Sequence, residues 1–567
     1  MAIGPGDRKS LEIWLYACAL ALVACSSPHR SPGTTTDDDG GAPDGGVWTI
    51  PGHRLDWSVL EGSENDTDIV GWAAERADAL GILPGGDPIV AGLFYEEAVF
   101  GEGTTHETHL VAKGKNDIFL ARYSPEGVLR WATSAGGPSH DYAWRIKVLR
   151  DDRVAVVGKL MGSAGVFGEG EPGEAVSVDT VADVAFVAVY DSQDGTLEWM
   201  RNVLYASFID CPTCSSCCDA VDELAGGEII VACGYDGPVS VCPPEVDEPL
   251  PLAPTEVGGG AVLTFSPDGE LIDHMLPEGN LTHYGATIDL RVRSDGGYYL
   301  AGSYTGTLSL GSHHLWQVEA AGDSSVFGAS FDAAGALEWL VDLGFGGFTE
   351  LPQWNDARAL AKGTDDFILS ARYSGAWAPV GEVGPIFQTG EDMTEGAMIA
   401  LGQDGQPLWW RTTRFECDPE TAEFCGSPNT ELRGAVVGPY GDLLVPGNST
   451  EMWKWDDVAI GVGGEGVEML AERTAGNSVI PNGFVAGFSS YGDVDWVSPA
   501  VSHSDDPTSS GRFLPKEMAF DSEGNLYIAG ETYRRSTFGY GAIDAIELES
   551  VGYGIVLLRY SPIEPPE

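Results

Sequence analysis

The sequence predicts an all-β fold, a seven-bladed β-propeller of four-stranded antiparallel blades. Two short strand patterns alternate along the chain. One recurs seven times, the other recurs six times, and the two ends of the folded part carry the two halves of its seventh copy. Apolar residues alternate or run together between Asp, Ser and Gly turns, which is typical of strands and hairpins and not of helices.

The first pattern is a strand-turn-strand pair that ends in two apolar residues followed by Ala or Val and then Gly. Its cleanest copy is MAFDSEGNLYIAG, residues 518–530. Related copies end at Gly92, Gly158, Gly302 and Gly447, and degenerate copies end at Gly234 and Ala371. We expect each copy to supply the two inner strands of a blade, a and b.

The second pattern is an apolar strand and a tight turn, followed by Gly-x-Leu-x-Trp. It is clearest in DIFLARYSPEGVLRW, residues 117–131, and it supplies the outer strands c and d. Further copies end at Trp199, Trp339, Trp409 and Trp496, and a weaker copy has Asp273 in the Trp position. One Trp per repeat at a fixed strand position predicts packing between blades, in preference to ligand stacking.

The ends of the folded part supply the remaining unit. Residues 53–60 read as a d strand with no c strand before it, and residues 554–562 read as a c strand with no d strand after it. Trp57 stands where the Gly-x-Leu-x-Trp pattern would place it. Pairing of these segments would close the ring and remove the exposed edges of an open sheet.

These units resemble the bacterial β-propeller repeat lipoproteins (SBBP-like repeats), whose units read much like DIFLARYSPEGVLRW followed by AFDSEGNLYIAG. The resemblance covers about residues 53–562. It implies the propeller fold and says little about function. The copies here are more divergent than in typical members, and several b–c connections are longer.

The N-terminal residues 1–24 are expected to be a lipoprotein signal peptide. Arg8 and Lys9 precede an apolar run over residues 13–23, which is too short to span a membrane. The run ends in Leu-Val-Ala-Cys, which resembles a lipobox and predicts lipidation of Cys25. The alternative is an ordinary signal peptide cleaved nearby. By family analogy, Ser26 favours the outer membrane.

Residues 25–50 are rich in Gly, Pro, Ser, Thr and Asp and are expected to form a flexible acidic tether. Residues 51–567 are expected to form the propeller. The chain has 30 Lys and Arg against 86 Asp and Glu, a net charge of −56. A field of that sign repels nucleic acid and anionic membrane surfaces, so a nucleic-acid partner is excluded and the lipid anchor is the expected membrane contact. We expect a monomer.

Eight cysteines in the exported part predict disulfides. Cys417 and Cys425 share one d–a connection and are expected to bridge each other. Six more lie within one blade and leave the pairing open, a strained vicinal Cys217–Cys218 bridge included: Cys211, Cys214, Cys217, Cys218, Cys233 and Cys242. A metal site on the C-x-x-C-x-x-C-C run is the alternative, which an oxidising compartment disfavours.

The candidate binding surface is the face that carries the d–a and b–c connections, because the a–b and c–d turns are short. Five long connections lie there: residues 208–219, 236–256, 415–430, 448–482 and 498–516. Binding residues are often carried by loops on a rigid scaffold. The alternative is that these loops merely decorate a structural module.

No catalytic, metal or cofactor site is predicted. The sequence has no Gly-x-Ser-x-Gly elbow, His-Glu-x-x-His motif or P-loop, and His313-His314 is an isolated pair. Residues 64–68 could offer oxygen ligands to Ca²⁺ but lack EF-hand spacing, and a solvated loop is the simpler interpretation.

The functional hypothesis is therefore a non-enzymatic, lipid-anchored cell-surface module that binds a protein or glycan. The alternatives are a structural envelope component without a specific ligand and a secreted hydrolase or lyase. The last would need ionisable groups that converge near the propeller axis.

Overall fold

Residues 46–567 form one compact unit, and no part of the N-terminal 45 residues is described. The computed structural model describes residues 50–563 with these gaps: 63–74, 162–163, 178–182, 207–215, 236–238, 242–249, 252–258, 282–287, 311–312, 317–323, 344, 347–355, 374–375, 378–386, 389–393, 415–429, 450–452, 457–467, 470–481, 500–511 and 539–545. Within the described residues there is no helix of the length and hydrophobicity needed to cross a membrane.

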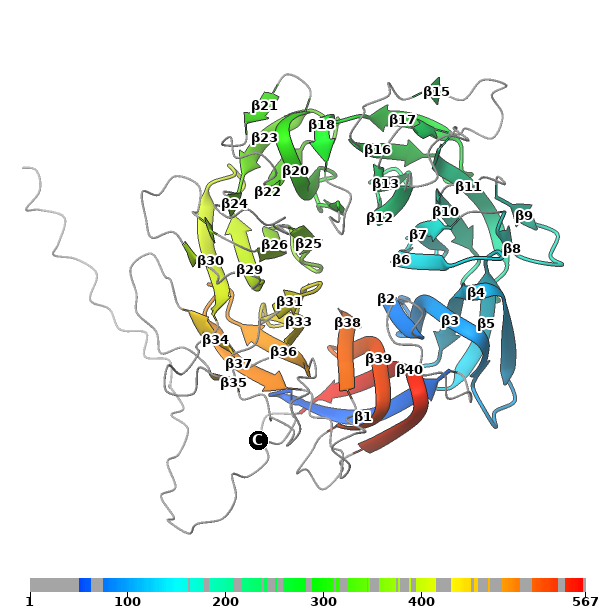
Figure 1. Cartoon of the computed structure of the whole chain (residues 1–567). Coiled ribbons are helices and arrows are strands. Elements are labelled where there is room, and N and C mark those ends of the chain that lie inside the picture. Colours follow the sequence, from blue (N-terminus) through cyan, green and yellow to red (C-terminus); the bar gives the residue numbers. More distant parts are fainter. Residues whose placement is uncertain are drawn as a thin grey trace, which may run out of the picture. The chain divides into compact units, whose positions relative to one another are not determined.

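Seven antiparallel sheets lie around a common axis, as the sequence predicts (Figure 1). We number the blades from the first whole sheet. In the order a, b, c, d they are blade 1, β2 (Arg76–Ile82), β3 (Pro88–Phe100), β4 (Thr108–Tyr123), β5 (Leu129–Ala135); blade 2, β6 (Asp141–Val148), β7 (Val154–Leu160), β10 (Val184–Tyr190), β11 (Leu197–Ala206); blade 3, β12 (Ser216–Glu223), β13 (Ile229–Tyr235), β16 (Gly259–Phe265), β17 (Leu271–Met275); and blade 4, β19 (Asp289–Val292), β20 (Tyr298–Leu310), β22 (Ser324–Phe331), β23 (Leu337–Asp342).

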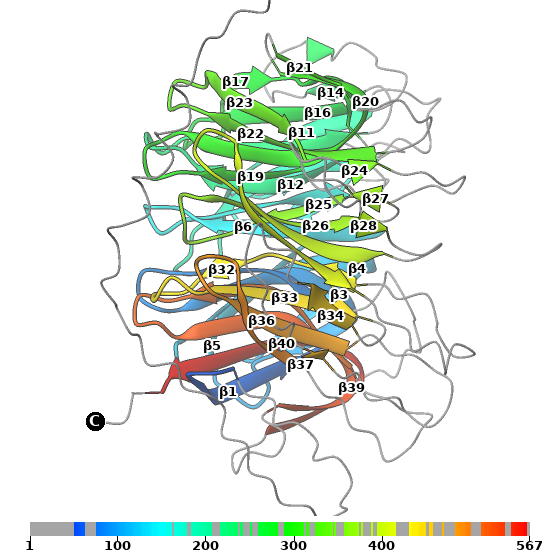
Figure 2. The same ribbon diagram turned by 90° about the vertical axis from the view of Figure 1, so that its left-hand side faces the viewer.

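The remaining three blades follow the same order. They are blade 5, β25 (Asp356–Leu360), β26 (Phe367–Tyr373), β29 (Glu395–Leu401), β30 (Pro407–Arg414); blade 6, β31 (Thr430–Leu432) with β32 (Val436–Val437), β33 (Leu443–Ser449), β36 (Asn482–Phe488), β37 (Val494–Pro499); and blade 7, β38 (Arg512–Phe520), β39 (Leu526–Phe538), β40 (Ile546–Pro562), β1 (His53–Glu61). Figure 2 shows the strands from the side, running between the two faces of the ring.

Blade 7 closes the ring as predicted. Its d strand, β1, pairs antiparallel with its c strand, β40, and Trp57 lies opposite Arg559 in that ladder. The carboxylate of Asp56 accepts hydrogen bonds from Arg559 Nη1 at 2.6 Å and from the Ser561 hydroxyl at 2.8 Å. The first and last strands of the propeller are therefore joined by both backbone and side chains.

The Trp series packs between blades, as predicted. In four junctions the indole N–H donates to a backbone carbonyl in the c–d turn of the following blade: Trp57 to Pro125 (2.9 Å), Trp131 to Ser192 (2.9 Å), Trp199 to Pro267 (3.0 Å) and Trp339 to Gln403 (2.9 Å). The turn glycine lies against the ring, so that a Cβ on Gly269 would come within 2.7 Å of Trp199. Apolar clusters that span neighbouring blades complete each junction, such as the one between blades 2 and 3.

Parts of the long b–c connections form strands on the preceding blade. From blade 3, β14 (Val239–Val241) pairs with β11 of blade 2 and β15 (Leu250–Pro251) pairs with β14. From blade 6, β34 (Trp453–Asp456) pairs with β30 of blade 5 and β35 (Glu468–Met469) pairs with β34. The remaining short strands are β8 (Val166–Phe167), β9 (Ala175–Val176), β18 (Glu278–Leu281), β21 (His313–Trp316), β24 (Phe345–Gly346), β27 (Ala376–Trp377) and β28 (Phe387–Gln388).

Candidate binding site: the axial pocket

The a strands lie nearest the axis (Figure 1). In six blades an a-strand residue pairs with the first residue of the b strand, at the end of the channel formed by the a–b turns; in blade 5 we take Lys362, two residues after the end of β25, as the matching position. We call these seven positions the mouth residues. They are Ile82, Val148, Glu223, Val292, Lys362, Val437 and Phe520. Five are apolar, and all five are only partly buried.

A cavity of about 490 Å³ lies inside this mouth. Its wall contains apolar side chains from the mouth residues, together with the charged groups of Lys147, Asp222, Arg291 and Lys362. A second cavity of about 330 Å³ adjoins it and shares Lys147 and three of the mouth residues. Together they form what we call the axial pocket, which lies at the a–b end of the channel.

Asp222 is the central carboxylate of the pocket. It is 1% exposed, and it contacts Lys147 of blade 2 at 2.5 Å. Its second oxygen accepts the backbone N–H of Val292 in blade 4 at 2.8 Å. Burial raises the pKa of Asp222, but Lys147 and Arg291 outweigh it and hold the pKa below its ordinary value. Asp222 is therefore a fixed negative charge whose hydrogen bonds are made within the protein.

Arg291 is less well paired. Its Nη1 lies 3.8 Å from the nearest Asp222 oxygen, which is beyond hydrogen-bonding distance. Its Nε is buried and has no hydrogen-bond partner among the described residues. The side chain is 17% exposed and lines the cavity. The unpartnered Nε is itself out of reach, so a ligand would contact Arg291 through the exposed part of the side chain that lines the cavity.

Lys362 supplies the third cation of the pocket. Its ammonium contacts the buried Glu517 of blade 7 at 3.1 Å. Burial lowers the pKa of Lys362, Glu517 opposes this, and Arg291 and Arg145 add to the lowering, so that the pKa lies below its ordinary value. Deeper along the axis, the field of Arg145 reaches carboxylates of four other blades: Glu517, Asp289, Asp219 and Asp78.

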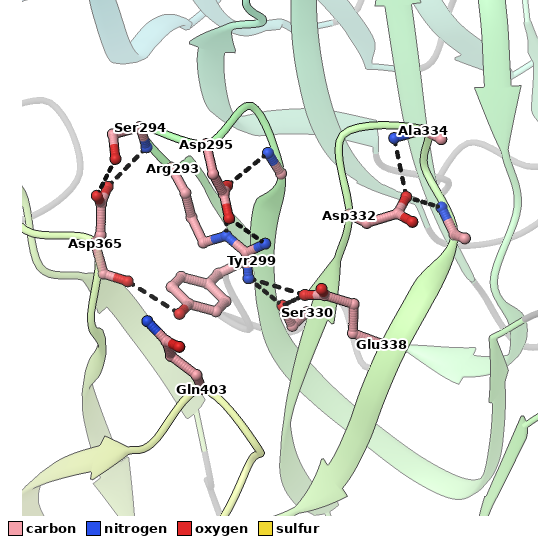
Figure 3. A network of polar contacts seen from close by, with 12 residues as sticks. Arg293, Ser294, Asp295, Tyr299, Ser330, Asp332, Ala334, Glu338, Asp365 and Gln403 are labelled. Atoms are coloured by element: carbon pink, nitrogen blue, oxygen red, sulfur yellow. Dashed lines mark hydrogen bonds and ion pairs between the residues drawn. The ribbon is translucent and has the colours of Figure 1, made fainter.

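A polar network joins the a–b turns of blades 4 and 5, which form the rim of the pocket on this side (Figure 3). The Asp365 carboxylate, which also lines the cavity, accepts hydrogen bonds from the backbone N–H and the hydroxyl of Ser294. The Tyr299 hydroxyl donates to the Asp365 carbonyl at 2.9 Å. Arg293 contacts Glu338 at 2.9 Å within blade 4. The rim is thus fixed by bonds between neighbouring blades.

The predicted cysteine cluster is described only in part. Cys218 and Cys233 form a disulfide between β12 and β13, which fits the prediction of bridges in this blade. Cys217 departs from it. Its thiol is free and buried, and it donates to the Asp219 carboxylate at 3.2 Å, because its side chain points away from its bonded neighbour. The prediction that Cys217 forms a disulfide is therefore wrong, and the open alternative of a Cys217–Cys218 bridge is excluded.

The other predicted site residues lie outside the described residues and stay predictions. They are Cys25, Cys211, Cys214, Cys242, Cys417 and Cys425, the calcium candidate at 64–68 and most of the long connections. The described residues hold no group of three or more His, Cys, Asp or Glu that could bind a metal ion.

The axial pocket was not found from the sequence, although a signal exists. Lys147, Asp222 and Arg291 occupy the same a-strand position in three successive blades, one residue before the mouth position. The corresponding residues in other blades include Gly81 and Ala519. An alignment of the repeats on their a–b turns would have placed these three charged groups side by side.

Comparisons with known proteins add only distant similarities. No protein-family model and no curated protein matches the chain. Among solved structures the chain is similar to a quinohemoprotein alcohol dehydrogenase from Pseudomonas putida, at 10% identity and a TM-score of 0.38, over 91% of this chain and 77% of that one. It is also similar to BamB from Moraxella catarrhalis, at 10% identity and a TM-score of 0.33, over 89% and 99%. Such similarities give no argument about activity or partners. The propeller rests on the strand pairing itself, and membership of the repeat-lipoprotein family stays a prediction.

Proposed function

We propose that this chain is a non-enzymatic binding module of the cell exterior, held at the outer membrane by a lipid on Cys25, and that its axial pocket takes a small ligand. The anchor and the tether rest on the sequence alone. The proposal for the pocket is supported by one observation: a cavity of about 490 Å³ on the axis, with charged groups fixed around it.

The charged groups are held before any ligand arrives. Asp222 is fixed by Lys147 and by the Val292 backbone, and Lys362 is fixed by Glu517. Preorganised charged groups beside apolar side chains favour ligand binding, because little ordering entropy is then lost on binding. The proposed ligand site lies at the a–b end of the channel, opposite the loop-rich d–a and b–c face that the sequence predicts as the binding surface.

A binding role fits the wall of the cavity better than catalysis. A hydrolase or lyase would need an acid, a base or a nucleophile that converge on one point. The lining of this cavity, as far as the structure describes it, offers three cations held near carboxylates and contains no His, Cys or Ser. The proposal therefore includes no reaction and no resident cofactor.

A plugging variant tests the site. Ala519 is a small, partly buried residue of the lining, so Ala519→Trp should fill part of the cavity. Saturation-transfer NMR of the full chain against a panel of carboxylates, amines, amino acids and sugars should give ligands that Ala519→Trp loses. The control Ala334→Trp adds the same side chain on an exposed turn and should keep them. Ligands that persist in Ala519→Trp, or no ligand at all, would exclude the axial pocket as the site.

The anchor has its own test. Wild-type cells grown with labelled palmitate should incorporate label into the chain, and Cys25→Ser should abolish it. A chain that stays unlabelled, and that begins at another residue after export, would favour an ordinary signal peptide.

A further inference from the structure

The larger cavity of the axial pocket is lined by more cations than carboxylates, in a chain that has few cations. The whole chain carries 30 Lys and Arg against 86 Asp and Glu. Three of those cations, Lys147, Arg291 and Lys362, line one cavity. The lining has two carboxylates, Asp222 and Asp365. Two of the three have close carboxylate partners within the protein, Lys147 in Asp222 and Lys362 in Glu517, which leaves Arg291 as the one of the three that an external anion would serve.

Neither lining carboxylate completes the hydrogen bonding of Arg291. Asp222 is already bonded to Lys147 and to the Val292 backbone. Asp365 is bonded to Ser294 at the rim (Figure 3). The guanidinium is a planar donor group that matches a carboxylate with two parallel hydrogen bonds. The unmet capacity of Arg291 therefore points to an anionic group from outside the protein.

Four apolar mouth residues line the same cavity, beside the charged mouth residue Lys362. They are Ile82, Val148, Val292 and Phe520, and each is only partly buried. Val148 and Val292 each lie one residue further toward the a–b end than Lys147 and Arg291, which precede them on the same strands. A ligand that entered through the mouth would meet these apolar side chains and Lys362 first, and Lys147 and Arg291 next. An anion surrounded by its own water shell would gain nothing from these apolar side chains, whereas an apolar body would.

We propose that the axial pocket binds a small organic monoanion, a carboxylate carried on an apolar body, with the carboxylate on Arg291 between Lys147 and Lys362 and the apolar body within the mouth. This proposal rests on the proposed function and names the ligand class of that site. A free carboxylic acid and the C-terminal carboxylate of a short peptide present the same chemistry.

Unmodified protein provides the first test. Isothermal titration of the full chain with 3-phenylpropionate, at about 0.15 M salt where long-range repulsion is screened, should give saturable binding with a Kd on the order of 100 µM. The matched amide, 3-phenylpropanamide, should bind at least about 10-fold more weakly because it lacks the charge-assisted hydrogen bonds. Acetate should bind more weakly because it lacks the apolar body. A parallel titration with acetyl-Ala-Phe shows whether a peptide carboxylate is the preferred source.

Variants provide the second test. Arg291→Gln should weaken binding of 3-phenylpropionate about 10- to 100-fold and leave binding of the amide unchanged. Arg54→Gln removes the same charge from an exposed position on β1 and should change neither. Equal binding of acid and amide by the wild type, or an equal effect of Arg291→Gln and Arg54→Gln, would overturn the proposal. If the amide binds as well as the acid and Ala519→Trp abolishes both, the ligand class is wrong but the proposed site stands. If nothing binds, both fail.

Discussion

Glu61 offers a test of how the ring closes, because its carboxylate lies buried between the last blade and the first. It ends β1 in blade 7, and one of its oxygens accepts the Gly101 N–H at 2.9 Å and the Tyr123 hydroxyl at 3.1 Å, both in blade 1. Burial raises the pKa of Glu61 from 4.5 to about 7, although these two hydrogen bonds oppose the shift. Glu61→Gln keeps an oxygen that accepts both bonds and removes the ionisation.

The sign of the effect follows from this raised pKa. Between about pH 4.5 and about pH 7 the folded protein keeps a proton on Glu61 that the unfolded chain releases, so a rise in pH favours unfolding. With those two values, the free energy of unfolding contributed by Glu61 falls by about 2–3 kcal/mol between about pH 5 and about pH 8. An unfolding entropy of roughly 1 kcal/mol per kelvin for a domain of this size converts this to about 2–3 °C.

Differential scanning calorimetry at the two pH values measures this effect. We expect Glu61→Gln to melt about 3 °C above the wild type at about pH 8 and within about 1 °C of it at about pH 5. Glu126→Gln, on an exposed turn, removes the same charge and should show no such pH dependence. A shift of Glu61→Gln that is equal at both pH values, or a loss of stability at about pH 8, would refute the reasoning.

Three further predictions concern the junctions and the cysteines. Gly269→Ala and Gly335→Ala both place a side chain at positive φ, +83° and +77°, but of the two only Gly269 lies against a Trp. Thermal unfolding should therefore show that Gly269→Ala loses about 1–3 kcal/mol more stability than Gly335→Ala. Equal losses of stability would contradict the packing role of the Trp series. Removal of the chain up to residue 61 deletes β1, the partner of β40. The truncated protein should have a lower melting temperature and form aggregates in size-exclusion chromatography, because the edge of β40 is then exposed. A monomer of unchanged melting temperature would argue against closure by β1. Burial and Asp219 raise the pKa of the Cys217 thiol. Maleimide should therefore label Cys217 only after unfolding without reductant, and mass spectrometry should show Cys218 and Cys233 unlabelled because they are bonded to each other. Rapid labelling of Cys217 in the native protein would contradict its burial.

The fold was predictable because its signals are local and repeat. Each hairpin carries its own turn residues and its own alternation of apolar side chains, so seven copies reinforce one interpretation. The half-units at the two ends then fixed the closure, which the pairing of Trp57 with Arg559 confirms. The strands on neighbouring blades were not predictable. The β14 segment has no partner near it in sequence, and its pairing with β11 depends on where the b–c connection of blade 3 passes in space.

The candidate site was missed for a related reason. Loop length favoured the d–a and b–c face. The axial pocket instead combines short groups of residues from several repeats, and its charged residues Lys147, Asp222, Arg291 and Lys362 lie about 70 positions apart in the sequence. In a chain with 86 acidic residues, an isolated Asp222 or Lys147 in a short strand looks like a solvated charge. Only the register of the blades shows that Asp222 is 1% exposed and contacts Lys147.

The separation between the apolar junctions and the charged axis explains how such a pocket is tolerated. Buried ion pairs such as Lys362–Glu517 contribute little net stability, because desolvation offsets most of the attraction. The junctions hold the ring together without them, through apolar clusters and indoles that bond across the outer strands, as Trp199 bonds to Pro267. Side chains at the axis can therefore vary from blade to blade while the scaffold stays intact. A charged group at the axis that adds little to folding favours a binding role, and among the three cations of the cavity Arg291 lies furthest from its carboxylate, at 3.8 Å from Asp222.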